Sequence, residues 1–92
     1  MEPIEVRKPT KQQKELLEQQ PTWEHDIETW PAEYDERCET FLVIFGKGSI
    51  QLADGRKYTF EQGDLVTCQP HTKCVWTVDE YIKKHYIFDM ES

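Results

Sequence analysis

Residues 62–78 read QGDLVTCQPHTKCVWTV, and this stretch decides the fold class. A Gly-Asp turn at residues 63–64 leads into the apolar run LVTC, Pro70 interrupts the chain, and a second apolar run, CVWTV, follows. Two short apolar strands separated by a proline bend are typical of an all-β domain. The second strand also carries Cys74, which is a candidate ligand or core side chain.

The rest of the chain continues the β pattern. Apolar runs with turn residues between them predict strands at residues 23–29, 41–52, 56–60, 64–68, 73–78 and 81–88. Short strands at this spacing are typical of a sandwich or barrel. Asp54-Gly55 predicts a tight hairpin, since Asp-Gly supplies the positive φ angles that such a turn needs. Residues 41–45 are apolar on both faces, which predicts cover on both sides, for example by a second sheet and a partner chain.

The N-terminal part has a different character. Residues 1–21 are expected to form an extension, with an extended segment at 4–6 and a helix over 11–19. Thr10 followed by Gln13 is a capping-box pattern, and Pro21 ends the helical segment. With only two leucines, this helix is expected to pack as a strap. The barrel domain is expected to cover residues 22–92.

Composition limits the possible functions. The chain has 92 residues, which is the length of one domain with a single core. Its net charge of -7 disfavours nucleic acid and anionic membranes as partners. The sequence shows no apolar run of about 18 residues and no export signal, so we expect a cytoplasmic protein that does not enter a membrane. Three cysteines are an odd number, which favours free thiols in a reducing compartment.

Several motifs together resemble the cupin family, whose fold is the double-stranded β-helix or jelly roll. They are the Gly-Lys-Gly turn at 46–48, the Asp-Gly hairpin, Phe-x-x-Gly-Asp at 60–64 and the proline bend before Trp76. More narrowly, PTWEHDIETWPAEYDERCETF, GDLVTC, CVWTV and KKHY resemble the small single-domain cupins related to the ureidoglycine aminohydrolase cupin domain. Many of those proteins have no assigned function. The resemblance covers residues 6–88 and implies an all-β jelly-roll barrel with a short N-terminal helix.

The resemblance also implies a metal site, because cupins commonly hold a divalent ion on three histidines and one glutamate. Glu39, with six residues between it and Gly46, stands at the glutamate position. Cys74 stands where the second motif of the family has histidine. The sequence therefore departs from the usual ligand set.

The two upstream histidine positions differ as well. Depending on the spacing, they correspond to Glu33 with Asp35 or to Ala32 with Tyr34. Glu39 and Cys74, with one of these carboxylates, remain a candidate site for zinc, manganese or iron. The alternative is that Cys74 is a small buried apolar side chain in a barrel without that site.

The inward-facing residues of the expected strands form a candidate ligand pocket, which an aromatic lining would suit. Its proposed members are Trp23, His25, Tyr34, Glu39, Phe41, Cys74, Trp76 and His85. For the aromatic residues the alternative is simple core filling. His25 is either a pocket base or ligand, or a hydrogen-bonded core residue, and His85 is a candidate for the pocket mouth.

Four further residues receive a plain structural interpretation. Cys38 and Cys68 are expected to be structural or surface residues. Lys83 and Lys84 are expected to form a solvated strand end rather than an anion site.

Two functional hypotheses follow. The first is a small cupin that binds a small organic ligand in its barrel without the three-histidine metal site. The second is a metal-dependent cupin enzyme of the hydrolase or isomerase type, in which Glu39 and Cys74 hold an ion that activates water. A third possibility is that the protein is mainly an interaction subunit; it draws on the doubly apolar strand at residues 41–45 and predicts a homodimer.

Overall fold

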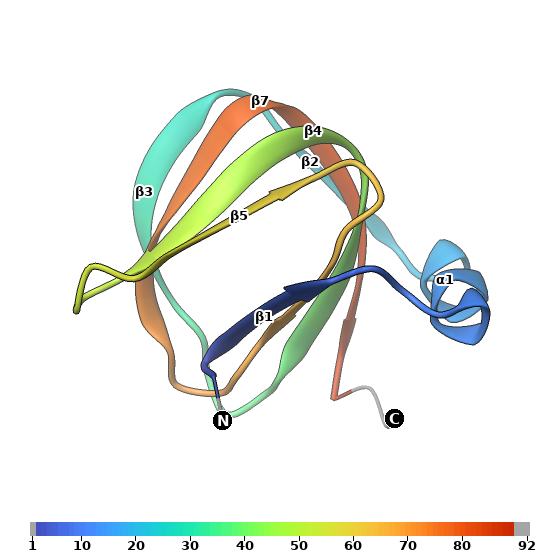
Figure 1. Ribbon diagram of the computed structural model, residues 1–92, viewed down its shortest axis with the longest axis horizontal. Coiled ribbons are helices and arrows are strands. Elements are labelled where there is room, and N and C mark those ends of the chain that lie inside the picture. The colour runs from blue at the N-terminus through green and yellow to red at the C-terminus, as the bar shows by residue number, and fades with distance from the viewer. Residues whose placement is uncertain (1, 90–92) are drawn as a thin grey trace.

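The protein, seen here as a computed structural model that describes residues 2–89, is an antiparallel β-barrel with one helix on its outside (Figure 1). The elements in chain order are β1 (Ile4–Arg7), α1 (Lys11–Glu18), β2 (Thr22–His25), β3 (Glu28–Glu33), β4 (Glu39–Leu52), β5 (Lys57–Glu61), β6 (Leu65–Cys68) and β7 (Lys73–Phe88). No helix within residues 2–89 is long and apolar enough to cross a membrane.

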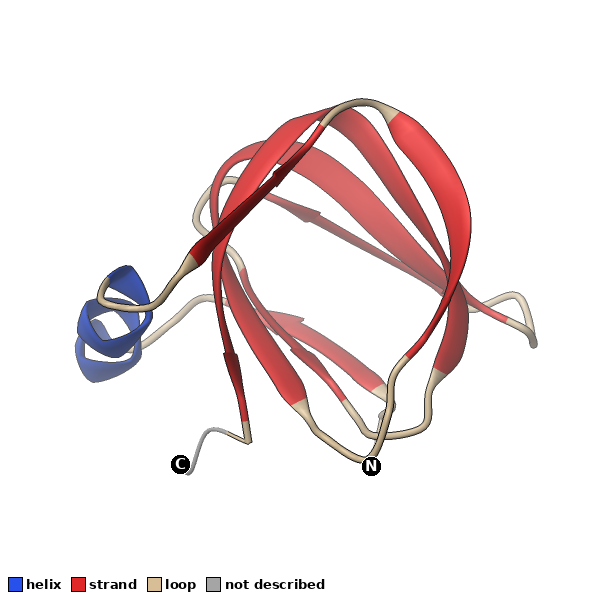
Figure 2. Ribbon diagram, turned by 180° about the vertical axis from the view of Figure 1, so that it is seen from behind, coloured by secondary structure: helices blue, strands red, loops and turns tan. Residues whose placement is uncertain are grey.

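Two long strands organise the sheet. β4 and β7 are 14 and 16 residues long and pair with each other along most of their length. The strand order is β1-β6-β4-β7-β2, while β5 pairs with the second half of β4 and β3 with the first half of β7. Because both long strands bend, the sheet curls round into a barrel, as Figure 2 shows from behind. The all-β barrel expected from the sequence is confirmed.

Glycines lie where the long strands bend and where the hairpin turns. Gly46 has a φ of 97°, and a Cβ there would lie 2.2 Å from the carbonyl oxygen of Tyr81 on the neighbouring strand. The β4–β7 register shifts between Val43 and Gly48, around this close approach. The Asp-Gly hairpin is confirmed, with Gly55 at a φ of 95° and the N–H of Leu52 donating to the carbonyl of Arg56 at 2.8 Å.

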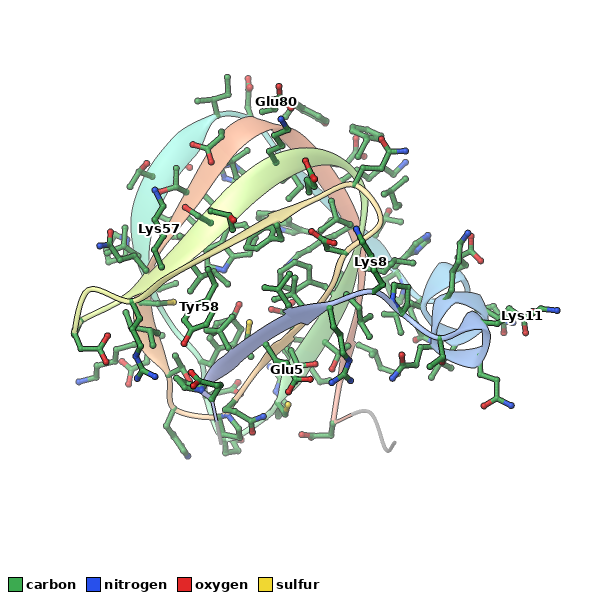
Figure 3. All side chains as sticks on the ribbon, in the orientation of Figure 1. Glu5, Lys8, Lys11, Lys57, Tyr58 and Glu80 are labelled. Carbon is green, nitrogen blue, oxygen red and sulfur yellow. The ribbon has the colours of Figure 1, made fainter. Side chains whose placement is uncertain are left out.

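The helix closes over the outer face of the barrel. Its capping box is confirmed: the N–H of Gln13 donates to the hydroxyl of Thr10, and the Gln13 side chain accepts from the Thr10 N–H. Leu17 is fully buried and packs with Leu42 and Leu65 on the outside of the sheet. Thus α1 supplies, from within the chain, the outer cover that was expected from a second sheet or partner at this part of β4. Figure 3 shows side chains crowding the inside of the strand ring, whereas Lys11 points away from the barrel.

Three features differ from the expected elements. The segment 1–21 is not separate from the barrel, because β1 pairs with β6 and Ile4 is buried in the core. The expected strand 23–29 is broken after His25. There the Asp26 carboxylate accepts a hydrogen bond from the N–H of Ile27, and the Ile27 side chain is exposed. The expected strands 73–78 and 81–88 are one continuous strand, β7.

Candidate functional site

Aromatic side chains from four strands fill one part of the barrel interior. Trp30 on β3 and Trp76 on β7 are register partners and stack with ring centroids 5.5 Å apart. Trp23 from β2 meets the edge of Trp76 at 5.8 Å, and Phe41 from β4 lies 5.7 Å from Trp76. Such contacts add stability beyond burial alone. We refer to these four side chains as the aromatic wall.

A buried ion pair lies against this wall. The Nζ of Lys84 is 3.1 Å from Oε2 of Glu39, and the two residues are only 5% and 6% exposed. Glu39 begins β4, and Lys84 reaches the interior because it pairs with Val43, whose side chain faces the core. A charged pair so far out of water persists only when its polar atoms find partners inside the protein.

Three aromatic rings supply further partners for the ammonium group. The Nζ of Lys84 lies 4.0 Å from the ring centroid of Phe41, 4.8 Å from that of Trp23 and 5.0 Å from that of Trp76. Each ring face attracts a cation, most strongly where water is excluded. The Glu39 carboxylate and this aromatic cage together replace the water that Lys84 loses on folding.

The ion pair is reached through a small cavity. Trp23, Glu39, Lys84, Tyr86 and Phe88 line a space of about 260 Å³. Four of these residues belong to β2 and β7, and the fifth begins β4. We refer to this space as the mouth cavity.

A second polar group adjoins Glu39. The indole N–H of Trp76 donates to the hydroxyl of Tyr34 at 3.1 Å. Burial raises the pKa of Tyr34 far above its ordinary range, and burial also raises the pKa of the Cys68 thiol to about 12. Cys68 is the register partner of Glu39 on β6. Both groups are therefore neutral near pH 7, and Glu39 and Lys84 carry the only charges of this interior cluster.

Five of the predicted pocket residues are brought together here. Glu39 and Trp23 line the mouth cavity, while Phe41, Trp76 and Tyr34 form the layer behind it. His25 lies next to them at the rim, with its ring centroid 5.1 Å from Trp23 and 4.6 Å from Trp30. Its Nε2 is 3.0 Å from the Glu28 carboxylate, so this ring is fixed by an aromatic stack and a surface carboxylate.

The structure places the two remaining predicted pocket residues, Cys74 and His85, away from the mouth cavity. Cys74 is buried, but it pairs with Leu52 at the opposite end of β4 from Glu39 and lines another cavity. His85 follows the inward-facing Lys84, so the alternation along a strand turns it to the outer face. There its Nδ1 lies 2.8 Å from the carbonyl of Gln20, close to α1 rather than at the barrel mouth.

The cupin metal does not fit the residues present. Within residues 2–89, no group of three or more His, Cys, Asp or Glu side chains is placed to hold a metal ion. The Glu39 carboxylate, which stands at the family's ligand position, is held by an ammonium group that already neutralises it. The residues present therefore support no catalytic step through a metal at this site.

Two important residues were not singled out from the sequence. The expectation that Lys84 belongs to a solvated strand end is wrong, because its side chain is buried. Its position two residues after Ile82 and two before Tyr86, on an otherwise apolar face, was the available signal. Cys68 was given a structural or surface interpretation, and it proves to be a fully buried neighbour of Glu39.

The fold and the interior together define the class of protein: a small cupin barrel with an aromatic interior. The chain belongs to the EutQ-like cupin domain family, whose model matches residues 13–86. The narrower relationship to ureidoglycine aminohydrolase cupins is not established by this match.

Solved structures agree with this assignment. A DUF861-family protein from Thermotoga maritima is 37% identical, with a TM-score of 0.83 over 91% of this chain and 97% of that one. The EutQ protein of Clostridium difficile is 25% identical, with a TM-score of 0.66 over 73% of this chain; the match spans 52% of EutQ. A DUF861-family protein of unknown function from Pseudomonas syringae pv. tomato, 24% identical with a TM-score of 0.66 over 73% of this chain and 28% of that one, shares the fold. No curated protein matches the chain.

Proposed function

We propose that the protein binds a small organic ligand in the mouth cavity, with the Glu39–Lys84 pair as the polar anchor. The observation that carries this proposal is a buried ion pair that also lines a cavity. Ion pairs that serve stability alone do not need access to a cavity, and a well-packed apolar pair is often as stable. A ligand that contacts both charged groups explains why this ion pair lines a cavity.

The shape and chemistry of the cavity support a small, partly apolar ligand. A volume of about 260 Å³ is just below the usual range for ligand pockets, so a molecule of drug size does not fit. Trp23, Tyr86 and Phe88 offer aromatic surface, while Glu39 and Lys84 offer an acceptor and a donor. A specific binding site usually combines an apolar and aromatic lining with a small number of polar groups, as this cavity does.

We also propose a homodimer and a cytoplasmic location. An exposed apolar pair supports the first: Phe45 and Tyr81 are 40% and 45% exposed and stack with their centroids 6.1 Å apart. Three free cysteines support the second, since a reducing compartment keeps thiols free. The motif in residues 21–41 supports a narrower relationship to ureidoglycine aminohydrolase cupins. Light scattering at micromolar concentration tests the dimer, and a monomer would count against it.

The binding proposal is tested by a fragment screen followed by two-dimensional NMR. Fragments that bind should shift the indole signal of Trp23 and the amide signals of Glu39 and Lys84. Trp23→Ala should weaken these hits, while Trp30→Ala, which alters the aromatic cluster but not the lining of the mouth cavity, should weaken them less. Hits that shift only residues beside α1 would place the binding site elsewhere and refute the proposal.

A further inference from the structure

We infer that the ligand of the mouth cavity is uncharged and carries a hydrogen-bond acceptor directly beside a donor, as a small carboxamide does. This inference rests on the proposed function and narrows its ligand class. It depends on the charge balance at the ion pair, on the bonds that the pair can still make, and on the size of the cavity.

The charge balance argues against an ion. Glu39 and Lys84 neutralise each other at 3.1 Å, and Tyr34 and Cys68 beside them are protonated near neutral pH. An anion bound here would compete with Glu39 for the single ammonium, and a cation would compete with Lys84 for the single carboxylate. Either leaves a buried charge without full compensation, which is costly at sites as enclosed as these. An uncharged ligand leaves the pair intact.

The pair still has bonding capacity. An ammonium group has three N–H donors and a carboxylate accepts about four hydrogen bonds. The only side-chain hydrogen bond that Glu39 and Lys84 make within residues 2–89 is the one between them. Both groups therefore offer sites to a ligand in the cavity that they line, one as donor and the other as acceptor.

The geometry of the pair suits a carboxamide. Bond lengths near 1.23 and 1.33 Å place the oxygen and nitrogen of a carboxamide about 2.3 Å apart. The Lys84 and Glu39 atoms are 3.1 Å apart, so a carbonyl oxygen facing Lys84 and an N–H facing Glu39 can bond side by side. The rest of the ligand then lies against the aromatic side chains that line the cavity.

Three probes of nearly equal shape separate the alternatives: benzamide, benzoate and benzylammonium. At about 0.3 kcal/mol per non-hydrogen atom, probes of this size bind with Kd values near ~10 mM, which an NMR titration of the labelled protein measures. We expect benzamide to shift the Trp23 indole signal with a Kd at least ten-fold lower than that of either ion. Lys83→Met, which removes a neighbouring cation on the other face of β7, should leave this order unchanged.

Charge-altering variants provide the second arm. Glu39→Gln leaves the cluster with a net positive charge, so benzoate should gain about ten-fold relative to benzamide. Lys84→Met leaves a net negative charge, so benzylammonium should gain instead. The wild-type order alone decides the matter if either variant fails to fold.

The outcomes also separate this inference from the proposal beneath it. If benzoate or benzylammonium binds wild-type protein most tightly, with shifts at the mouth cavity, the ligand class is overturned and the binding site stands. If none of the three probes shifts these signals at millimolar concentration, both the ligand class and the binding site are overturned.

Discussion

The buried pair makes a quantitative prediction about stability. At 3.1 Å and an effective dielectric constant of about 20, the attraction between Glu39 and Lys84 is about 5 kcal/mol. Desolvation opposes this gain, so the pair itself contributes little net stability; removing one partner, however, leaves the other charge buried alone. We therefore expect Lys84→Met and Glu39→Gln each to lower the free energy of unfolding by about 3–5 kcal/mol. The double variant should lose much less than the sum.

The assay is urea unfolding followed by tryptophan fluorescence, since Trp23 and Trp76 contact Lys84 and Trp30 stacks on Trp76. With a slope of about 1 kcal/mol per molar urea, each single variant should unfold at least ~3 M earlier. Lys47→Met is the matched control: Lys47 is 4.0 Å from Glu61 and both side chains are more than half exposed, so its loss should cost less than about 1 kcal/mol.

Two results would refute this reasoning. One is a loss below about 1 kcal/mol in both single variants, which would mean that the charges are well solvated. The other is a double variant whose loss equals the sum of the singles, since residues in contact should show coupling. Where a single variant does not fold, recovery of the folded state in the double variant supports the predicted coupling between the two charges.

Three further predictions concern the helix, the strand crossing and the buried thiol. Leu17→Ala should lower the free energy of unfolding by about 2–5 kcal/mol, because Leu17 is fully buried against the barrel. Leu16 is 39% exposed, so Leu16→Ala should lower it by less than about 1 kcal/mol. Urea midpoints measure both losses, and equal losses would mean that α1 does not pack on the barrel. Gly46→Ala should lower the free energy of unfolding by about 3 kcal/mol or more, because the new Cβ would meet the backbone of the neighbouring strand. Gly55 has open space around it, so Gly55→Ala should cost only about 1 kcal/mol of backbone strain. Thermal melts measure the difference, and equal losses would contradict the prediction. The pKa of Cys68 in the folded protein, about 12, exceeds the 9.0 of a free thiol, so this residue has no effect on stability below pH 9 and lowers it as pH rises from 9 toward 12. Between pH 7 and pH 10 its share of the loss should be about 1.4 kcal/mol, absent in Cys68→Ala, and identical pH dependence in both proteins would refute it.

Local patterns in the sequence were sufficient for much of the fold. The Thr10–Gln13 capping box predicted the start of the helix, and Asp54-Gly55 predicted the hairpin, because each depends on residues a few positions apart. The joining of 73–78 to 81–88 was missed, since a strand bent by register shifts depends on its partner strand and not on its own residues. The pairing of β1 with β6 depends on contacts more than 55 residues apart in the same way.

The site was predicted in part for a related reason. Alternation placed Glu39, Phe41 and Trp76 inward, and the structure brings them together. Lys84 was missed because the ordinary expectation is that a lysine is exposed. Its burial depends on the Glu39 carboxylate and on the rings of Phe41 and Trp23, which lie on other strands and far from it in the sequence. The third ring, that of Trp76, lies on the same strand.

The central claim is that the ammonium of Lys84 takes the place of a metal ion beside Glu39. Elemental analysis of protein purified without an affinity tag or chelator tests it most directly, with zinc, manganese, iron, nickel and copper counted per chain. We predict metal far below one ion per chain in the wild-type protein, with no change in Glu39→Gln. Close to one ion per chain in the wild type, lost in Glu39→Gln, would contradict the claim.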